Sequence, residues 1–235
     1  MRYAIYFTPD RDDPLTRVAA NWLGRDAFTG VTAPAPAIGR LSPAEIAFHT
    51  AAARRYGFHA TLKAPFSLAA GETQASLTKS LDVFSANMPA FSIPRLVIRQ
   101  LDGFFALVPE SPLPQLNRFA DDVVVAFERF RAPLSDTEMA RRSPDSLKPQ
   151  EFRNLHQWGY PYVFEAFRFH MTLSGRAGEA DAPRIAQAIE DFFGPVLDEP
   201  VPVDGLALFV EAEPGAPFEV MSYHPLGRDR ARKTA

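Results

Sequence analysis

The sequence predicts an α+β protein built from a duplicated unit of strand, helix, strand and strand. The pentapeptide FHATL at Phe58–Leu62 recurs as FHMTL at Phe169–Leu173, and its histidine recurs after 111 residues. A predicted glycine turn follows each histidine at nearly the same distance, 44 residues at Gly103 and 45 residues at Gly215. The similarity therefore extends past the pentapeptide to roughly fifty residues per copy. The 22 prolines divide the chain into short segments, as expected for an α+β protein with many turns.

The elements of the first half follow from residue type and spacing. Tyr3–Thr8 is rich in Tyr, Ile and Phe and ends before a proline, which favours a strand. Leu15–Leu23 has apolar residues at helical spacing. Ser42 followed by proline is a helix start signal, for a helix that extends to about Arg55. The first copy, about residues 57–109, is then predicted to contain the motif strand Tyr56–Phe66, the helix Glu72–Ala86 and the strands Phe91–Leu101 and Phe104–Val108.

The second half repeats this order. A helix at Leu113–Phe130 and a polar, proline-bearing stretch with some helical character at Ala132–Gly159 separate the copies. The second copy, about residues 168–226, is predicted to begin within the motif strand Tyr162–Ser174 and to contain the helix Ala182–Phe193 and the strands Val203–Glu211 and Phe218–His224. We expect one domain, residues 1–235, in which an approximate two-fold axis sets the motif strands beside a shared cleft. Residues 227–235 are expected to form a charged, frayed tail.

Composition narrows the classes of function. The formal net charge is −3, so no surface for an extended nucleic acid is indicated, and phosphate recognition must depend on a few placed side chains. The absence of cysteine excludes disulfides and thiolate metal sites. The first residues do not have the pattern expected of a signal peptide, and no run of about 18 apolar residues indicates a membrane span. We therefore expect a cytoplasmic protein, with a monomer favoured.

Each motif strand is predicted to have one polar and one apolar face, because side chains alternate along a strand. The apolar faces, with Phe58 and Phe169 among them, suit a core. The polar faces are predicted to consist of Gly57, His59, Thr61 and Lys63 in the first strand and of Arg168, His170, Thr172 and Ser174 in the second.

Paired histidines and threonines suit phosphodiester chemistry. With His59 and His170, a neutral imidazole can accept a proton from water or a hydroxyl while a protonated one donates to the leaving oxygen. The residues leave open which histidine has which role. The hydroxyls of Thr61 and Thr172 can donate hydrogen bonds to the phosphoryl oxygens, where negative charge resides.

Further candidates flank the motifs. Lys63 and Arg168 are predicted to add charge-assisted bonds to phosphate, the alternatives being a solvated lysine and a surface ion pair. Because they are not equivalent in the two copies, we expect a substrate with more anionic charge on one side. Tyr56, Tyr160 and Tyr162 are predicted to donate to phosphate or stack on a base or sugar, or else to fill a core or rim.

Other residues carry weaker signals. Tyr6 is a lesser candidate for the same site, and His49, His156 and His224 lack a repeated partner and are predicted to lie at the surface or in packing positions. The spacings of a zinc site are missing, and GETQAS from Gly71 lacks the Lys-Ser/Thr pair of a P-loop. We expect neither a metal nor another cofactor.

The longer contexts, RYGFHATLKAPF and GYPYVFEAFRFHMTLSGR, resemble the 2H phosphoesterase superfamily, which is marked by two His-x-Thr/Ser motifs in duplicated lobes. Within it they look like the DUF1045 branch, associated with phosphonate metabolism. The resemblance covers most of the chain. It implies a bilobal fold with two pseudo-symmetric antiparallel sheets lining a central cleft, helices outside, and metal-independent phosphodiester chemistry. The residues that match the motif are His59, Thr61, His170 and Thr172.

The leading hypothesis is a phosphodiesterase that opens a small cyclic phosphate ester. The resemblance suggests a phosphorylated ribose with a 1,2-cyclic phosphate, whose extra phosphate Lys63, Arg168 or Arg54 would hold. Two alternatives stay open: an enzyme acting on 2′,3′-cyclic phosphates at RNA ends, or related to RNA ligases, and a non-catalytic protein that binds a phosphorylated metabolite.

Overall fold

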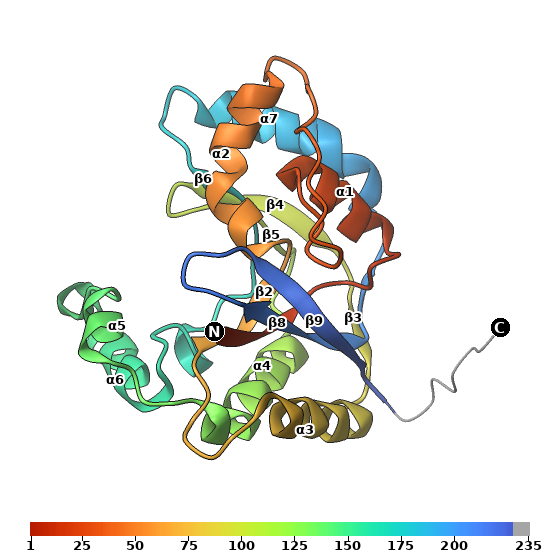
Figure 1. The fold of residues 1–235 in the computed structure, drawn as a ribbon. Helices are drawn as coiled ribbons and strands as arrows, with labels where there is room; N and C mark the ends of the chain where they lie inside the picture. Colours follow the sequence, from red (N-terminus) through yellow and green to blue (C-terminus); the bar gives the residue numbers. More distant parts are fainter. Residues whose placement is uncertain (228–235) are drawn as a thin grey trace.

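The computed structural model describes residues 1–227 (Figure 1). The predicted tail, apart from Gly227, lies outside the described residues. Short antiparallel sheets and seven α-helices make up the described chain, which confirms the predicted α+β class. Within residues 1–227, no helix combines the length and the apolar character that a membrane crossing requires.

Two main sheets organise the protein. The larger has the strand order β2-β1-β8-β9, and the smaller has the order β4-β5-β6. Their strands are β1 (Arg2–Phe7), β2 (Ala60–Phe66), β4 (Leu96–Leu101), β5 (Phe104–Pro109), β6 (Met171–Arg176), β8 (Gly205–Glu211) and β9 (Phe218–Pro225). A short ladder joins β3 (Phe91–Ile93) to β7 (Val201–Val203). Every pairing is antiparallel.

The motif strands are exchanged between the two halves of the chain. The first motif leads into β2, whose sheet contains β8 and β9 from the second half. The second motif leads into β6, which pairs with β5 from the first half. Neither main sheet is therefore formed by one contiguous half, and the two halves must fold together. The duplication itself stays a prediction.

The helices fall into three groups, which Figure 1 shows around the sheets. They are α1 (Pro14–Leu23), α2 (Pro43–Tyr56), α3 (Gln74–Asn87), α4 (Pro114–Ala126), α5 (Asp136–Ala140), α6 (Pro149–Trp158) and α7 (Ala182–Phe193). Helices α1, α2 and α7 gather at one end, α3 and α4 at the other, and α5 and α6 stand to one side. The predicted start of α2 is confirmed, with Ser42 accepting from the backbone N–H of Glu45 in a capping box.

The apolar faces of both motifs enter the core, as predicted. Phe58, Leu62, Phe169 and Leu173 are all buried. The indole N–H of Trp22 in α1 donates to the carbonyl of Leu173 at 2.8 Å inside this core. The motif strand β6 is thus fixed by packing and by a buried hydrogen bond.

Some predicted strands are shorter or divided. The strand predicted at Tyr162–Ser174 begins only at Met171, because residues 164–166 form a 3-10 turn with Phe164 in the left-handed region, at φ 53°. The strand predicted at Phe91–Leu101 is broken at Pro94, which has no backbone N–H for a ladder.

The strict alternation predicted for the first motif strand ends at a β-bulge. Thr61 lies opposite Tyr6 of β1, and Lys63 lies opposite Ile5. The chain therefore advances by two residues in β2 where it advances by one in β1, which is a β-bulge. Such a bulge changes the direction of the following side chain. Lys63 is only 3% exposed, and its amine donates to Glu128 at 2.8 Å. The prediction that Lys63 shares the face of His59 and Thr61 is wrong.

Lys63 instead belongs to a partly buried network that anchors the chain between the motifs. Glu128 also pairs with Arg131 at 2.6 Å. The guanidinium of Arg131 donates to the carbonyl oxygens of Ala132 and Gln157, at 3.1 and 3.2 Å. One side chain thus holds both ends of the segment that contains α5 and most of α6, which we call the insert (residues 132–157).

The network predicts unequal effects on stability. Glu128→Gln leaves the buried Lys63 ammonium without a carboxylate, and we expect a loss of roughly 3 kcal/mol in the free energy of unfolding. Lys63→Met leaves Glu128 paired with Arg131, so we expect a clearly smaller loss. Urea denaturation of both variants measures the difference. A larger loss for Lys63→Met than for Glu128→Gln would contradict the network.

Candidate active site

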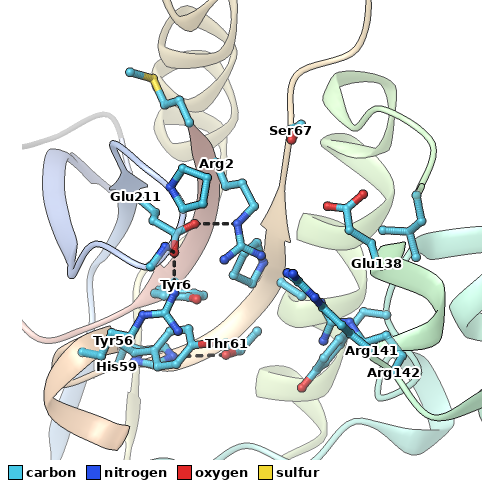
Figure 2. Close-up of a pocket in the computed structure, with 18 of the residues that line it drawn as sticks. Arg2, Tyr6, Tyr56, His59, Thr61, Ser67, Glu138, Arg141, Arg142 and Glu211 are labelled. Carbon is cyan, nitrogen blue, oxygen red and sulfur yellow. Dashed lines mark hydrogen bonds and ion pairs between the residues drawn. The ribbon is translucent and has the colours of Figure 1, made fainter. Parts of the chain in front are cut away.

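A cleft of about 860 Å³ brings the two motifs together. His59 and Thr61 line it from the first motif, and His170 and Thr172 line it from the second. Figure 2 shows the part of this cleft that contains His59, Thr61, Tyr6 and Tyr56. The predicted assembly of the four motif residues around one space is therefore present in the structure, while their roles in chemistry stay predictions.

Each histidine is oriented by the backbone two residues before it. The Nδ1 atom of His59 lies 2.9 Å from the carbonyl oxygen of Gly57, and that of His170 lies 2.8 Å from the carbonyl oxygen of Arg168. A carbonyl oxygen only accepts hydrogen bonds, so Nδ1 is the donor in both rings. In a neutral ring this leaves Nε2 as the acceptor, the form that a general base requires.

The backbone of Gly57 makes this contact possible for His59. Gly57 follows the last residue of α2 with φ at 76°, in the left-handed region that favours glycine. A Cβ at this position would also lie 2.6 Å from the Cβ of Ala27. The glycine before the first motif thus turns the chain from α2 towards β2 and presents its carbonyl to the ring.

The ring of His59 is enclosed by side chains from its own motif and from β1. Its ring stacks on Tyr6 of β1, with the centroids 3.9 Å apart and an interplanar angle of 22°. Its Nε2 lies 3.2 Å from the hydroxyl oxygen of Thr61, which donates when the ring is neutral. Tyr6 itself is buried, and this burial raises its pKa well above the usual value, so the phenol stays protonated.

Burial lowers the pKa of His59 to about 4. The hydrogen bond to Gly57 opposes this shift, and the nearby charge of His170 adds to it. His59 is therefore neutral at neutral pH, when the cleft holds no anion. This interaction between the two imidazoles also means that a proton on His170 disfavours a second proton on His59.

The predicted tyrosines divide between the cleft and its exterior. Tyr56 and Tyr160 line the cleft. The ring of Tyr56 stacks on Phe218 at 5.2 Å and stands 6.1 Å from the ring of His59. Burial raises the pKa of Tyr160, which keeps its hydroxyl protonated. Tyr162 is 46% exposed and does not line the cleft, so the structure does not bring it to the site.

The predicted cations do not reach the cleft. Lys63 is held by Glu128, as described above. The side chain of Arg168 is exposed and lines a separate depression, and only its backbone carbonyl serves the site. Arg54 donates to the carbonyl oxygens of Leu23 and Ala47 and supports α2. The assignments of Lys63 and Arg168 are corrected because side-chain direction in irregular or bulged backbone does not follow simple alternation. That of Arg54 is corrected because its guanidinium is engaged by backbone carbonyls beside α2.

The cations that line the cleft come from elsewhere in the chain. They are Arg2 of β1, Arg55 at the end of α2, and Arg141 and Arg142, which follow α5. Arg2 pairs with the buried carboxylate of Glu211 at 2.6 Å, and Arg55 pairs with the same carboxylate. Arg55 opens RYGFHATLKAPF, the context of the first motif, but it is not among the residues predicted for the site. No motif marked Arg2, Arg141 or Arg142, although the adjacent Arg141 and Arg142 in a polar stretch form a charge pattern that the sequence shows.

The remaining histidines lie outside the site, as predicted. His224 is buried and bonded to Asp82 at 2.7 Å and to Ser222 at 2.8 Å. His156 is exposed on α6, and His49 contacts the ring of Phe48. Across residues 1–227, no three His, Asp or Glu side chains gather as a metal site would require.

The fold and the cleft define an α+β protein with two motif histidines that face one space. A family model described as "Protein of unknown function (DUF1045)" matches residues 61–219, and the chain belongs to this family. The predicted resemblance to the DUF1045 branch is thereby confirmed.

Two curated relatives are similar over most of this chain. Both have the name Ribose 1,5-bisphosphate phosphokinase PhnN. The protein of Janthinobacterium sp. (strain Marseille) is 38% identical over 221 residues, covering 92% of this chain and 49% of the relative. That of Laribacter hongkongensis (strain HLHK9) is 36% identical, covering 94% and 50%. The chain spans about half the length of the curated relatives it matches.

Solved structures align with this chain at low sequence identity. TT0787 of Thermus thermophilus aligns with a TM-score of 0.45 at 17% identity, over 98% of this chain and all of the other. LigT of E. coli, in complex with 3′-AMP, aligns with a TM-score of 0.40 at 13% identity, over 96% of this chain and 98% of the other.

The low pKa of His59 predicts a measurable titration. We expect one imidazole to titrate near pH 4 by NMR, and its signal to be absent in His59→Gln. Unfolded His59 binds a proton below about pH 6.5 but the folded form does so only near pH 4. His59 therefore lowers stability as the pH falls through that window, and His59→Gln should weaken the pH dependence there.

The exposed His156 provides the control for this titration. His156→Gln should keep the signal near pH 4 and the full pH dependence of stability. A titration of His59 at or above 6.5 would show that the ring is not enclosed as the structure describes.

Proposed function

We propose that the protein is a phosphodiesterase that opens a small cyclic phosphate ester by general acid–base catalysis. The observation that carries this proposal is the matched placement of His59 and His170. Both donate from Nδ1 to a carbonyl and line the same cleft, each with a threonine of its own motif. A protein that only bound a phosphorylated metabolite would not require two imidazoles held in this way.

We assign the base to His59 and the acid to His170. A neutral His59 accepts a proton at Nε2 from the attacking water, and its low pKa supports this neutral form. The water oxygen bonds to phosphorus while the bond to one ring oxygen of the ester breaks. A protonated His170 gives its proton to that leaving oxygen. The product is a phosphomonoester with one free hydroxyl.

The pKa of about 4 is that of His59 in the empty cleft. A bound phosphodiester anion would favour the protonated ring and raise the pKa towards neutrality, which makes His59 a better base. The hydroxyl of Thr61, which now donates to His59, would then be free to donate to a phosphoryl oxygen, as would that of Thr172.

For the substrate we propose a 5-phosphorylated ribose with a 1,2-cyclic phosphate. Breaking its bond from phosphorus to O2 leaves the phosphate on C1 and produces ribose 1,5-bisphosphate. That compound is named in the two curated relatives, which are phosphokinases by name and about twice as long as this chain. No P-loop motif occurs in this chain, so we attribute the kinase chemistry to the part of those relatives that it does not span.

A panel of substrates tests the proposal. Purified protein is incubated with 5-phosphoribosyl 1,2-cyclic phosphate, with a nucleoside 2′,3′-cyclic phosphate and with an oligonucleotide that ends in a 2′,3′-cyclic phosphate. We expect the ribosyl substrate to be turned over most efficiently, with and without EDTA. Preference for the oligonucleotide would favour RNA-end processing. Thermal stabilisation by these ligands without any product would favour a binding protein.

The histidine assignment predicts large losses of rate. His59→Ala and His170→Ala should each lower kcat by roughly 10²- to 10⁴-fold, because each removes one proton transfer. The wild type should show a bell-shaped dependence of kcat/KM on pH. His156→Ala, at an exposed position on α6, is the matched control and should keep full activity. Full activity of either cleft variant would overturn the catalytic assignment.

A further inference from the structure

The charges around the cleft are unbalanced among the described residues. Four arginines but only two glutamates line it. Arg2 and Arg55 both pair with the carboxylate of Glu211. The other two cleft arginines are Arg141 and Arg142. Neither Arg141 nor Arg142 forms an ion pair with a carboxylate of residues 1–227.

One carboxylate does stand near this pair. Glu138, one turn before Arg142, lines the cleft, and its charge interacts with that of Arg142. Its carboxylate, however, accepts hydrogen bonds from the backbone N–H and the hydroxyl of Ser135, both at 2.9 Å. It closes the capping box of α5, so it does not cover the forks of the two arginines.

The two arginines stand opposite the motif histidine. Figure 2 shows Arg141 and Arg142 reaching into the pocket from the insert, across from His59 and Tyr56. The guanidinium of Arg142 lies 5.2 Å from the centre of the Tyr160 ring, which also lines the cleft. A stacked arginine of this kind keeps its planar fork available for an anion.

The segment that carries the pair is anchored at both of its ends. Ser143, directly after Arg142, has φ at 46°, an uncommon conformation for a residue other than glycine. Both ends of the insert are tied to Arg131, and through Glu128 to Lys63 of β2. The strand that carries Thr61 and the segment that carries the arginines are thus connected through one partly buried network.

From this geometry we infer that Arg141 and Arg142 form a second phosphate subsite, which binds a phosphomonoester of the substrate while its cyclic diester lies at the histidines. A phosphomonoester has a charge of about −1.5 to −2 at neutral pH, which matches two unpaired guanidinium groups. The inference rests on the proposed function for the identity of the substrate, in which the phosphomonoester is the 5-phosphate. The sequence predicted a substrate with more anionic charge on one side, bound by Lys63 and Arg168. The inference assigns that side of the substrate to Arg141 and Arg142 instead.

Two substrates that differ in one phosphate test the subsite in catalysis. They are the 1,2-cyclic phosphate of ribose with and without the 5-phosphate. The double variant R141Q/R142Q should lower kcat/KM for the 5-phosphorylated substrate by roughly 100-fold, mainly through KM, because these groups bind away from the reacting atoms. The preference of the wild type for the 5-phosphorylated substrate should then disappear. An unchanged preference would overturn the inference.

A binding measurement separates this inference from the proposed function. Ribose 5-phosphate contains no cyclic ester, so its binding, measured by calorimetry against ribose, does not depend on turnover. We expect the wild type and the H59A/H170A variant to bind it, and R141Q/R142Q to bind it at least about tenfold more weakly. If no cyclic ester is turned over but this pattern holds, the subsite stands and the proposed function falls.

The matched control is Arg99→Gln, which removes an exposed arginine of β4 that does not line the cleft. It should bind ribose 5-phosphate as the wild type does. Arg141 is exposed and Arg142 half-buried, so circular dichroism and the melting temperature should show R141Q/R142Q to be folded. Binding of ribose 5-phosphate by the folded double variant at wild-type affinity would disprove the subsite.

Discussion

The buried ammonium of Lys63 is the constraint on which the architecture around the cleft depends. A charge out of contact with water requires a partner, and Lys63 has the carboxylate of Glu128. That carboxylate in turn holds Arg131, which holds both ends of the insert. A residue that resembles a phosphate ligand in the sequence thus serves to position the segment that carries the cleft's unpaired arginines.

The exchange of motif strands explains why the two histidines meet. Because β2 joins the sheet of β8 and β9 while β6 joins that of β4 and β5, each half of the chain completes the sheet of the other. The motifs then face one cleft from two sheets, and the apolar residues on their opposite faces share one core. Packing of Phe58 and Phe169 therefore supports the placement of the polar residues beside them.

The two histidines share one feature of the backbone and differ in their surroundings. Both donate from Nδ1 to the carbonyl oxygen of the residue two positions earlier, so Gly57 and Arg168 correspond in the use of their carbonyls and not in their side chains. The two rings differ in the side chains that surround them. His59 stacks on the buried Tyr6 and has a lowered pKa, which supports a distinction between base and acid that no comparison of the two pentapeptides reveals.

The sequence by itself determined the α+β class, most helices and strands, and the four motif residues, because hydrophobic periodicity and a repeated local pattern depend on neighbours along the chain. It also placed Tyr56 and Tyr160 among the candidates that the structure brings to the cleft. Only the tertiary structure decided which cations line the cleft. A bulge in β2 turned Lys63 inward, and Arg168 precedes its strand, while Arg2, Arg141 and Arg142 reach the cleft from distant segments. The direction of a long side chain depends on register and on contacts remote in sequence, and these exist only once the sheets have paired.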